Sequence, residues 1–106
     1  IQPSVTKCGG ISGMKRIFTL ARAYSVRVVP HCFYWGPGYH ATAHLAASRP
    51  ESTLLETAFI DFIIQPHKLF EASQSSLDLS EKPGLGFEAD WDALSSYVVS
   101  RHSMSS

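Results

Sequence analysis

The sequence predicts an α/β fold in which parallel strands alternate with helices. Short segments rich in β-branched residues alternate with segments whose apolar residues recur every three or four positions. This order of strand, helix, strand, helix and strand, with tight connections, is typical of parallel βαβ units. The step from Ser4 to Arg27 and on to Leu54 is about 25 residues, which is the length of one unit of a βα barrel.

The first unit is expected to hold a strand over residues 5–8 (VTKC) and a helix that ends near Ser25. The glycines at 9–10 stop the strand, and Ser12 is the expected N-cap of the helix. Residues at helical spacing form one apolar stripe, which predicts an amphipathic helix: Met14, Ile17, Phe18, Ala21 and Tyr24.

The second unit begins with the clearest strand of the chain, residues 26–29 (VRVV). Pro30 has no backbone N–H, so regular pairing should stop close to His31. A second helix is expected over residues 39–48, because this segment is rich in Ala and Pro50 follows it.

The rest of the chain is less regular. Residues 53–56 (TLLE) are read as a third short strand, and the apolar stretch 59–64 is read as an extended wall segment or an aggregation-prone stretch. Residues 73–80 are polar and loop-like, and residues 83–87 (PGLGF) have turn chemistry. A short helix is expected at residues 90–94, where carboxylates lie at the favourable N-terminal end.

A three-stranded parallel sheet is incomplete on its own. A closed βα barrel needs eight strands and typically about 250 residues, whereas three strands leave two open edges and uncovered apolar faces. The chain also starts at Ile1 without an initiator Met. We therefore expect a fragment of a larger domain.

Composition excludes several classes of partner. The chain has 106 residues, and its nine Lys and Arg balance nine Asp and Glu. Zero net charge removes the electrostatic basis for binding nucleic acid or an anionic membrane surface. No apolar run approaches the ~18 residues of a membrane span, and no signal peptide is evident. Cys8 and Cys32 are too few for a disulfide framework, so we expect reduced thiols in a cytoplasmic protein.

Polar residues that follow the predicted strands are the candidates for chemistry, because barrel enzymes act where strands end. These are Ser4 or Lys7 on the first strand, His31 on the second and Glu56 on the third. His31 is the strongest candidate, because it joins an apolar strand to an aromatic loop and imidazole titrates near working pH. The alternatives are a structural histidine at a strand end, and a Glu56 that forms a structural ion pair with an arginine.

Three further motifs each have two interpretations. His40 and His44 are four apart on a predicted helix, so they either share a zinc ion or are surface or interface histidines. Residues 36–38 (GPG) at a helix start either cradle an anionic group through backbone N–H groups or form a simple hinge. The aromatic tract at 33–35 (FYW) either walls a substrate pocket or packs between helices.

Four stretches, in order and correctly spaced, resemble one known family. The chain is similar to the last three barrel strands and tail of the acid-sugar dehydratases and cycloisomerases in the mandelate racemase and muconate-lactonizing branch of the enolase superfamily. The stretches that carry this resemblance are 2–11 (QPSVTKCGGI), 29–38 (VPHCFYWGPG), 54–56 (LLE) and 83–87 (PGLGF).

The resemblance implies a fold and a cofactor. The fold is the C-terminal part of a (β/α)7β barrel, with three βα-type strands and two helices in residues 1–57 and a closing tail in residues 58–106. A separate capping domain and the early strands would be absent from this chain. One Mg²⁺, held by carboxylates of the third, fourth and fifth strands, would bind the substrate carboxylate, and its ligands would lie upstream of Ile1. Family members are often homo-oligomers.

The resemblance also implies site roles. A base removes the proton α to the carboxylate of a sugar acid, as in dehydratases, epimerases and cycloisomerases. His31 matches the seventh-strand histidine that acts as base or acid, and Glu56 matches the eighth-strand carboxylate that contacts the substrate carboxylate or enediolate. Phe33, Tyr34 and Ser4 are the expected substrate-binding residues.

One position departs from the family pattern. Ser4 stands where the family has an aspartate that orients the histidine, and a hydroxyl does not stabilise imidazolium as a carboxylate does. The resemblance implies part of a Mg²⁺-dependent sugar-acid enzyme, and we expect this fragment alone to be inactive because the metal ligands would lie upstream of Ile1. The alternative is a non-catalytic remnant or interaction module.

Overall fold

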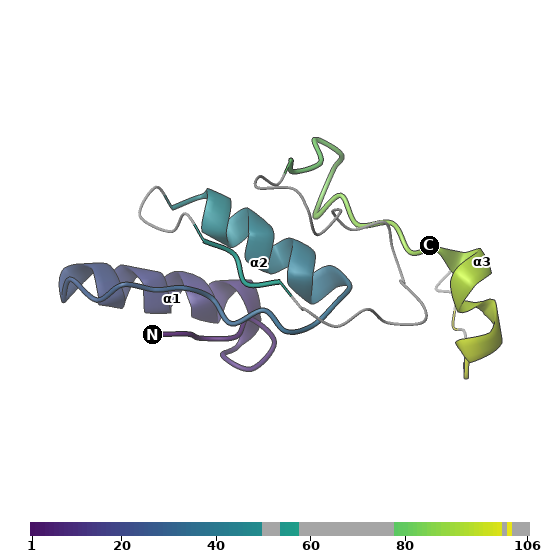
Figure 1. Cartoon of the computed structure of the whole chain (residues 1–106), viewed down its shortest axis with the longest axis horizontal. Helices are drawn as coiled ribbons and strands as arrows, with labels where there is room; N and C mark the ends of the chain where they lie inside the picture. The colour runs from purple at the N-terminus through teal and green to yellow at the C-terminus, as the bar shows by residue number, and fades with distance from the viewer. Residues whose placement is uncertain (50–53, 58–77, 101, 103–106) are drawn as a thin grey trace.

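The computed structural model describes residues 1–49, 54–57, 78–100 and 102, and within the first of these ranges two helices lie over extended chain (Figure 1). Helix α1 spans Gly10–Ala23 and helix α2 spans Pro37–Ala47. Near the C-terminus, α3 spans Trp91–Leu94 and the 3-10 turn η1 spans Ser95–Tyr97. Thr53, the stretch 59–64 and loop residues 73–77, for which we made predictions, lie outside the described residues.

Helix α1 confirms the predicted apolar stripe. Met14, Phe18 and Ala21 are buried, whereas Tyr24 follows the helix and is 74% exposed. The predicted N-cap is wrong, because the helix begins at Gly10 and Gly9 precedes it with a left-handed φ of 87°. Glycine adopts this conformation without a Cβ penalty, so the chain enters the helix earlier than a Ser12 cap would allow.

The predicted strand over residues 5–8 is wrong, because these residues form a turn. The backbone N–H groups of Lys7 and Cys8 both donate to the Ser4 carbonyl at 3.0 Å, and that of Gly10 donates to Val5 O at 3.0 Å. The turn packs tightly on the first turn of α1, where a Cβ built on Gly13 would overlap the Cys8 carbonyl. Local hydrogen bonds and glycine packing thus override the β propensity of the segment.

The extended pairing lies one step earlier, between residues 1–3 and 27–31. The Ile1 amino group donates to Arg27 O at 2.7 Å, Val29 N–H donates to Ile1 O at 3.0 Å, and His31 N–H donates to Pro3 O at 3.1 Å. Bonds that advance by two residues on both segments are those of a parallel pair. Pro3 has no N–H to return a bond, so the described residues contain no regular strand, including at the predicted 26–29.

Pro30 acts as predicted, since the His31 bond is the last bond between the two segments. Successive N–H groups of an extended chain point to opposite sides, so Pro30 and Cys32 face away from residues 1–3. Residues 54–57 attach on that other side through the Glu56 side chain, to which Cys32 N–H donates at 2.7 Å. The predicted third strand is wrong for its described residues 54–56, which form no strand and are held to the neighbouring segment through the Glu56 side chain.

Helix α2 completes the buried centre. It begins at Pro37, two residues before the predicted start, because proline suits the first turn of a helix. It ends at Ala47 with Ser48 as the C-cap, close to the predicted end. It packs on α1, and one apolar core joins both helices to the extended chain: Val5, Met14, Phe18, Ala21, Val28, Ala41 and Leu45.

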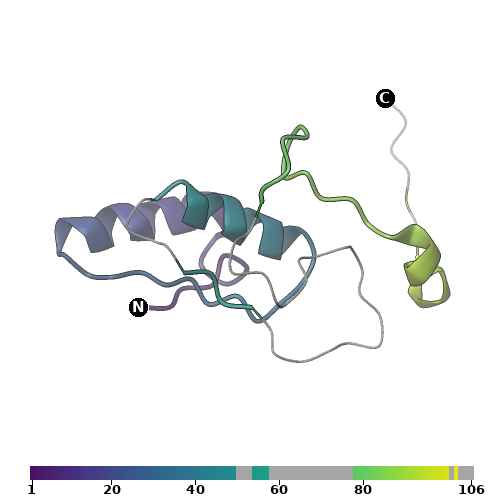
Figure 2. The same cartoon turned by 45° about the horizontal axis from the view of Figure 1, so that its top comes forward.

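Helix α3 lies away from α1 and α2, as both views show (Figures 1 and 2). Asp90 is the N-cap of α3 and accepts a hydrogen bond from Ala93 N–H at 2.9 Å, which confirms the predicted short helix. Among the described helices, α3 contacts only the η1 turn that follows it. No helix of the described residues is long and apolar enough to cross a membrane.

Candidate functional site

His31 and Glu56, the two predicted catalytic residues, lie side by side. The distance from His31 Nδ1 to Glu56 Oε2 is 2.8 Å, and the side chains are 37% and 35% exposed. Both are therefore accessible to a small molecule yet partly shielded from water. The sequence left open an ion pair of Glu56 with an arginine, whereas among the described residues its partner is the imidazole of the neighbouring segment.

The Glu56 carboxylate is held by two donors on one oxygen. Oε2 accepts from the Cys32 backbone N–H at 2.7 Å and lies 2.8 Å from His31 Nδ1. A backbone donor has a fixed direction, so this bond sets where the carboxylate lies relative to the imidazole ring. Bonds to an ionised acceptor are also roughly twice as strong as bonds between neutral groups.

Ser4 does not take the place of the missing family aspartate. Its side chain is buried, with 7% exposure, and its hydroxyl lies 2.9 Å from Thr6 Oγ1. Ser4 lies close to Tyr34. Burial raises the pKa of Tyr34, while hydrogen bonds with Thr42 and with the Ser4 hydroxyl oppose this rise. Contact of Ser4 with substrate stays a prediction.

The three residues of the aromatic tract make different contacts, and a role in walling a substrate pocket stays a prediction. The Tyr34 ring meets the His31 ring edge to face, with 6.5 Å between centroids and 80° between planes, and its hydroxyl lies 2.8 Å from Thr42 Oγ1. Trp35 instead stacks on Tyr39 of α2, with centroids 6.5 Å apart. Phe33 is 37% exposed. Tyr34 therefore borders the imidazole, and Trp35 packs on a helix.

Cys32 lies directly behind the pair and is fully buried. Burial raises the pKa of its thiol to about 11, and the negative charge of Glu56 adds to this rise, while hydrogen bonds from Thr42 and Tyr34 oppose it. At neutral pH the group is a protonated thiol, which is a poor nucleophile. Cys8 and Cys32 are both free, as predicted.

Thr42 was not among the site residues predicted from the sequence. It is fully buried in α2, where its hydroxyl donates to Gly38 O at 2.8 Å and meets the Tyr34 hydroxyl. A β-branched polar residue within an Ala-rich helix was the available signal. Gly38 itself has no side chain where Thr6 and Tyr34 pack against the helix, which gives this glycine a packing role. Binding of an anion at residues 36–38 stays a prediction.

His40 and His44 hold residues 78–88, called here the closing segment, onto α2. His40 Nδ1 lies 3.3 Å and His44 Nε2 lies 3.2 Å from the Leu85 carbonyl oxygen. A carbonyl only accepts, so both nitrogens donate, which fixes the tautomer of each neutral ring. The described residues contain no group of three or more His, Cys, Asp or Glu side chains that could hold a metal, so the zinc interpretation finds no support.

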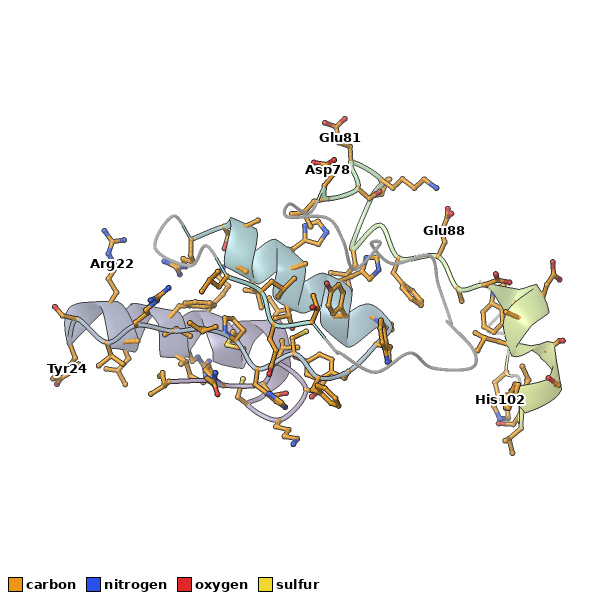
Figure 3. The ribbon with its side chains drawn as sticks, in the orientation of Figure 1. Arg22, Tyr24, Asp78, Glu81, Glu88 and His102 are labelled. Carbon is orange, nitrogen blue, oxygen red and sulfur yellow. The ribbon has the colours of Figure 1, made fainter. Side chains whose placement is uncertain are left out.

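These two histidines also line a cavity of about 190 Å³ together with residues of the closing segment. Glu81 and Glu88 of that segment point outward, away from α2 (Figure 3), whereas Asp78 lines the cavity. The segment is attached through the Leu85 carbonyl, through the Leu85 side chain, which packs against the core, and through the Phe87 ring, which meets the His40 ring edge to face with 5.3 Å between centroids.

Attachment of this segment is expected to weaken in mild acid. Desolvation is the main cause that lowers the pKa of His40, and the charge of His44 adds to it, while the bond to Leu85 opposes it. Because the unfolded chain then binds more protons than the folded one, stability falls as the pH drops through about 6.5 toward the lowered pKa. Urea titrations of the full-length protein between pH 7.5 and 5.5 measure this.

The control for that experiment is the same substitution at two histidines. His40→Gln is expected to flatten the pH dependence over this window, whereas His102→Gln, at an exposed position, should leave it unchanged. An equal pH dependence in His40→Gln and in the unmodified protein would contradict the assignment to His40.

Comparison with known proteins gives one family and several relatives. The family described as enolase C-terminal domain-like matches residues 1–93. A D-galactarolactone cycloisomerase of Agrobacterium fabrum is 33% identical over 92% of this chain and 29% of its own length. A D-xylonate dehydratase of Haloferax volcanii is 29% identical over 93% of this chain and 25% of its own length. A D-gluconate dehydratase of Thermoproteus tenax is 31% identical over 92% and 20%, respectively.

The chain thus spans between a fifth and three tenths of the length of these relatives. No solved structure matches it significantly. The family match covers His31, Glu56 and the closing segment, and it implies part of an α/β barrel. It confirms the resemblance drawn from the four motifs, and the chain therefore belongs to the enolase C-terminal domain-like family of the enolase superfamily.

Proposed function

We propose that this chain is the closing part of the barrel of an enzyme that removes the proton α to the carboxylate of a sugar acid, in a dehydration, epimerisation or cycloisomerisation. The observation that carries the proposal is the half-buried His31 ring beside the Glu56 carboxylate, 2.8 Å apart, where two extended segments end. Relatives named as sugar-acid dehydratases and as a cycloisomerase support the substrate class.

His31 is the proton-transfer group in this proposal. Its neutral imidazole accepts the proton as the C–H bond α to the carboxylate breaks, and the electron pair stays with the substrate. In a dehydration, that pair expels the neighbouring hydroxyl, which leaves as water once an acid supplies a proton. General acid–base catalysis of this kind typically contributes 10²–10⁴-fold to the rate.

The arrangement of the described residues supports a place within a larger barrel. Residues 1–3 and 27–31 pair in parallel, and large apolar side chains remain exposed along this region, including Ile1 at 62% and Leu54 at 55%. We propose that residues 1–57 are the last three strand–helix units and that residues 58–106 close the barrel, in a cytoplasmic homo-oligomer.

The Mg²⁺ that the resemblance implies does not fit the described residues alone. They contain no cluster of three potential ligands, and Oε2 of Glu56, the carboxylate of the site, already has two donors. When bound by residues elsewhere in the protein, the ion would stabilise negative charge on the substrate. The steps assigned to this chain use its own side chains.

Isotope exchange tests the proposal. The full-length protein, supplied with Mg²⁺ in D₂O, is incubated with a panel of C5 and C6 sugar acids, and NMR follows the proton α to the carboxylate. We expect at least one compound to lose this signal as deuterium replaces hydrogen or as product forms, whereas the 106 residues alone give no exchange. A folded full-length protein that exchanges none of them would instead favour the non-catalytic alternative.

A further inference from the structure

The imidazole of His31 is oriented by the group that faces its Nδ1 atom. In the described geometry the Nδ1 edge of the imidazole faces Glu56 Oε2 at 2.8 Å. An ionised carboxylate only accepts hydrogen bonds, so Nδ1 carries a proton whether the ring is neutral or charged. The lone pair of the neutral ring is then on Nε2, and that nitrogen is the one free to take a proton from a substrate.

Three contacts restrain this arrangement. The Cys32 backbone N–H fixes Oε2 from the segment that also carries His31, at 2.7 Å. The Tyr34 ring stands edge to face against the imidazole and limits its rotation. The Tyr34 hydroxyl is in turn anchored to buried Thr42 at 2.8 Å. The Glu56 carboxylate, the His31 ring and the Tyr34 side chain are thus each restrained by a contact besides the one between His31 and Glu56.

We propose that Glu56 is a positioning residue for His31 and supplies, from residues 54–57, the orienting carboxylate that Ser4 does not provide. The Ser4 hydroxyl is engaged with Thr6 at 2.9 Å, and His31 Nδ1 is occupied by Glu56. Glu56 then acts through the imidazole, in place of the direct contact with substrate that its position in the family implies. This inference rests on the proposed function for its kinetic part only.

The tautomer of His31 is the direct test, and it needs no substrate. In long-range ¹H–¹⁵N spectra of the full-length protein labelled in histidine, the His31 signal is identified by its loss in His31→Asn. At a pH where the ring is neutral, we expect the pattern of a protonated Nδ1 and an unprotonated Nε2. The opposite pattern in the unmodified protein would overturn the proposal without any Glu56 variant.

Two variants of Glu56 test whether a hydrogen-bond acceptor at this position sets the tautomer of His31. The amide oxygen of Glu56→Gln can still accept from Cys32 N–H and His31 Nδ1–H, so the tautomer should be largely retained. Glu56→Ala removes the acceptor, so the ring should return to a mixture of both tautomers. Glu88→Ala is the matched control, because Glu88 is exposed and its carboxylate pairs with Lys82, and it should leave the His31 spectrum unchanged.

Kinetics distinguish positioning from substrate contact. If Glu56 positions His31, Glu56→Ala lowers kcat about ten- to a hundredfold, as the loss of an orienting partner typically does, and leaves KM within about threefold. The double variant His31→Asn/Glu56→Ala is then no slower than His31→Asn alone, because the two residues act as one unit. A raised KM with additive losses would instead assign Glu56 to direct substrate contact and overturn the proposal.

Discussion

Replacement of His31 by Asn in the full-length protein is expected to lower kcat by about 10² or more, with the substrate that the exchange experiment identifies. Asparagine is close to histidine in size and retains a hydrogen-bonding group near the position of Nδ1, so the contact with Glu56 can persist. It cannot accept a proton at neutral pH. The loss of kcat therefore reflects the loss of proton transfer more than a change in packing. Steady-state kinetics measures kcat, and circular dichroism checks that the variant is folded.

The same substitution at an exposed histidine provides the control. His102 lies near the C-terminal helix α3, away from α1 and α2 (Figure 3), and is exposed. His102→Asn should keep kcat within about twofold of the unmodified protein. A near-normal kcat in His31→Asn would remove His31 from the mechanism, and the proton would then have to pass to a different group.

The second large effect is expected in the core. Met14 is fully buried between α1 and its neighbours, within the cluster that includes Phe18, Val28 and Leu45. Met14→Ala should lower the free energy of unfolding by about 2–5 kcal/mol, because it removes apolar contacts and leaves a cavity that the surroundings fill only in part. Urea titration of the full-length protein, followed by circular dichroism, gives this value.

An exposed apolar residue on the same helix is the matched control. Leu20 is 62% exposed, so Leu20→Ala should change the free energy of unfolding by less than about 0.5 kcal/mol if this face is in solvent. If Leu20 is instead covered by another part of the full-length protein, its variant will cost far more. That second result would locate an interface on α1, while equal small losses in both variants would contradict the core described here.

The helices were predictable because their signals are local. The stripe that contains Met14 and Phe18 marks one face of α1, and Pro50 lies just beyond the end of α2. Helix starts were harder to place, because Gly9 and Pro37 admit the chain into the helix before the expected residues. Each start depends on the backbone conformation that a glycine or a proline favours, and the spacing of apolar residues gives no information about it.

The extended segments were predicted less well, because pairing depends on partners distant in the chain. The β-branched residues at 5–8 suggested a strand, yet the Ser4 carbonyl captures two nearby N–H groups and closes a turn. The pairing then falls on residues 1–3, where Pro3 interrupts the ladder. A proline is visible in the sequence, but its effect appears only once the register against residues 27–31 is known.

The sequence predicted which residues form the candidate site, but it did not predict the hydrogen bonds between them. His31 and Glu56 were chosen because each follows a predicted strand, and the structure does bring them together. The bond between them, and the role of Cys32 N–H as a second donor, depend on which side of the chain each group faces. Tyr34 and Ser4 were also named, whereas buried Thr42, which anchors Tyr34, was missed.

One oxygen atom, Oε2 of Glu56, connects residues 54–57 to the Cys32 backbone N–H and also contacts the His31 imidazole. If residues 54–57 come loose, the ring is released in the same event, so local fraying and loss of turnover should share one temperature. A designer who wishes to lengthen or rebuild this segment has to preserve the reach of the carboxylate. The local stability of residues 54–57 and the orientation of the imidazole therefore depend on the same carboxylate oxygen.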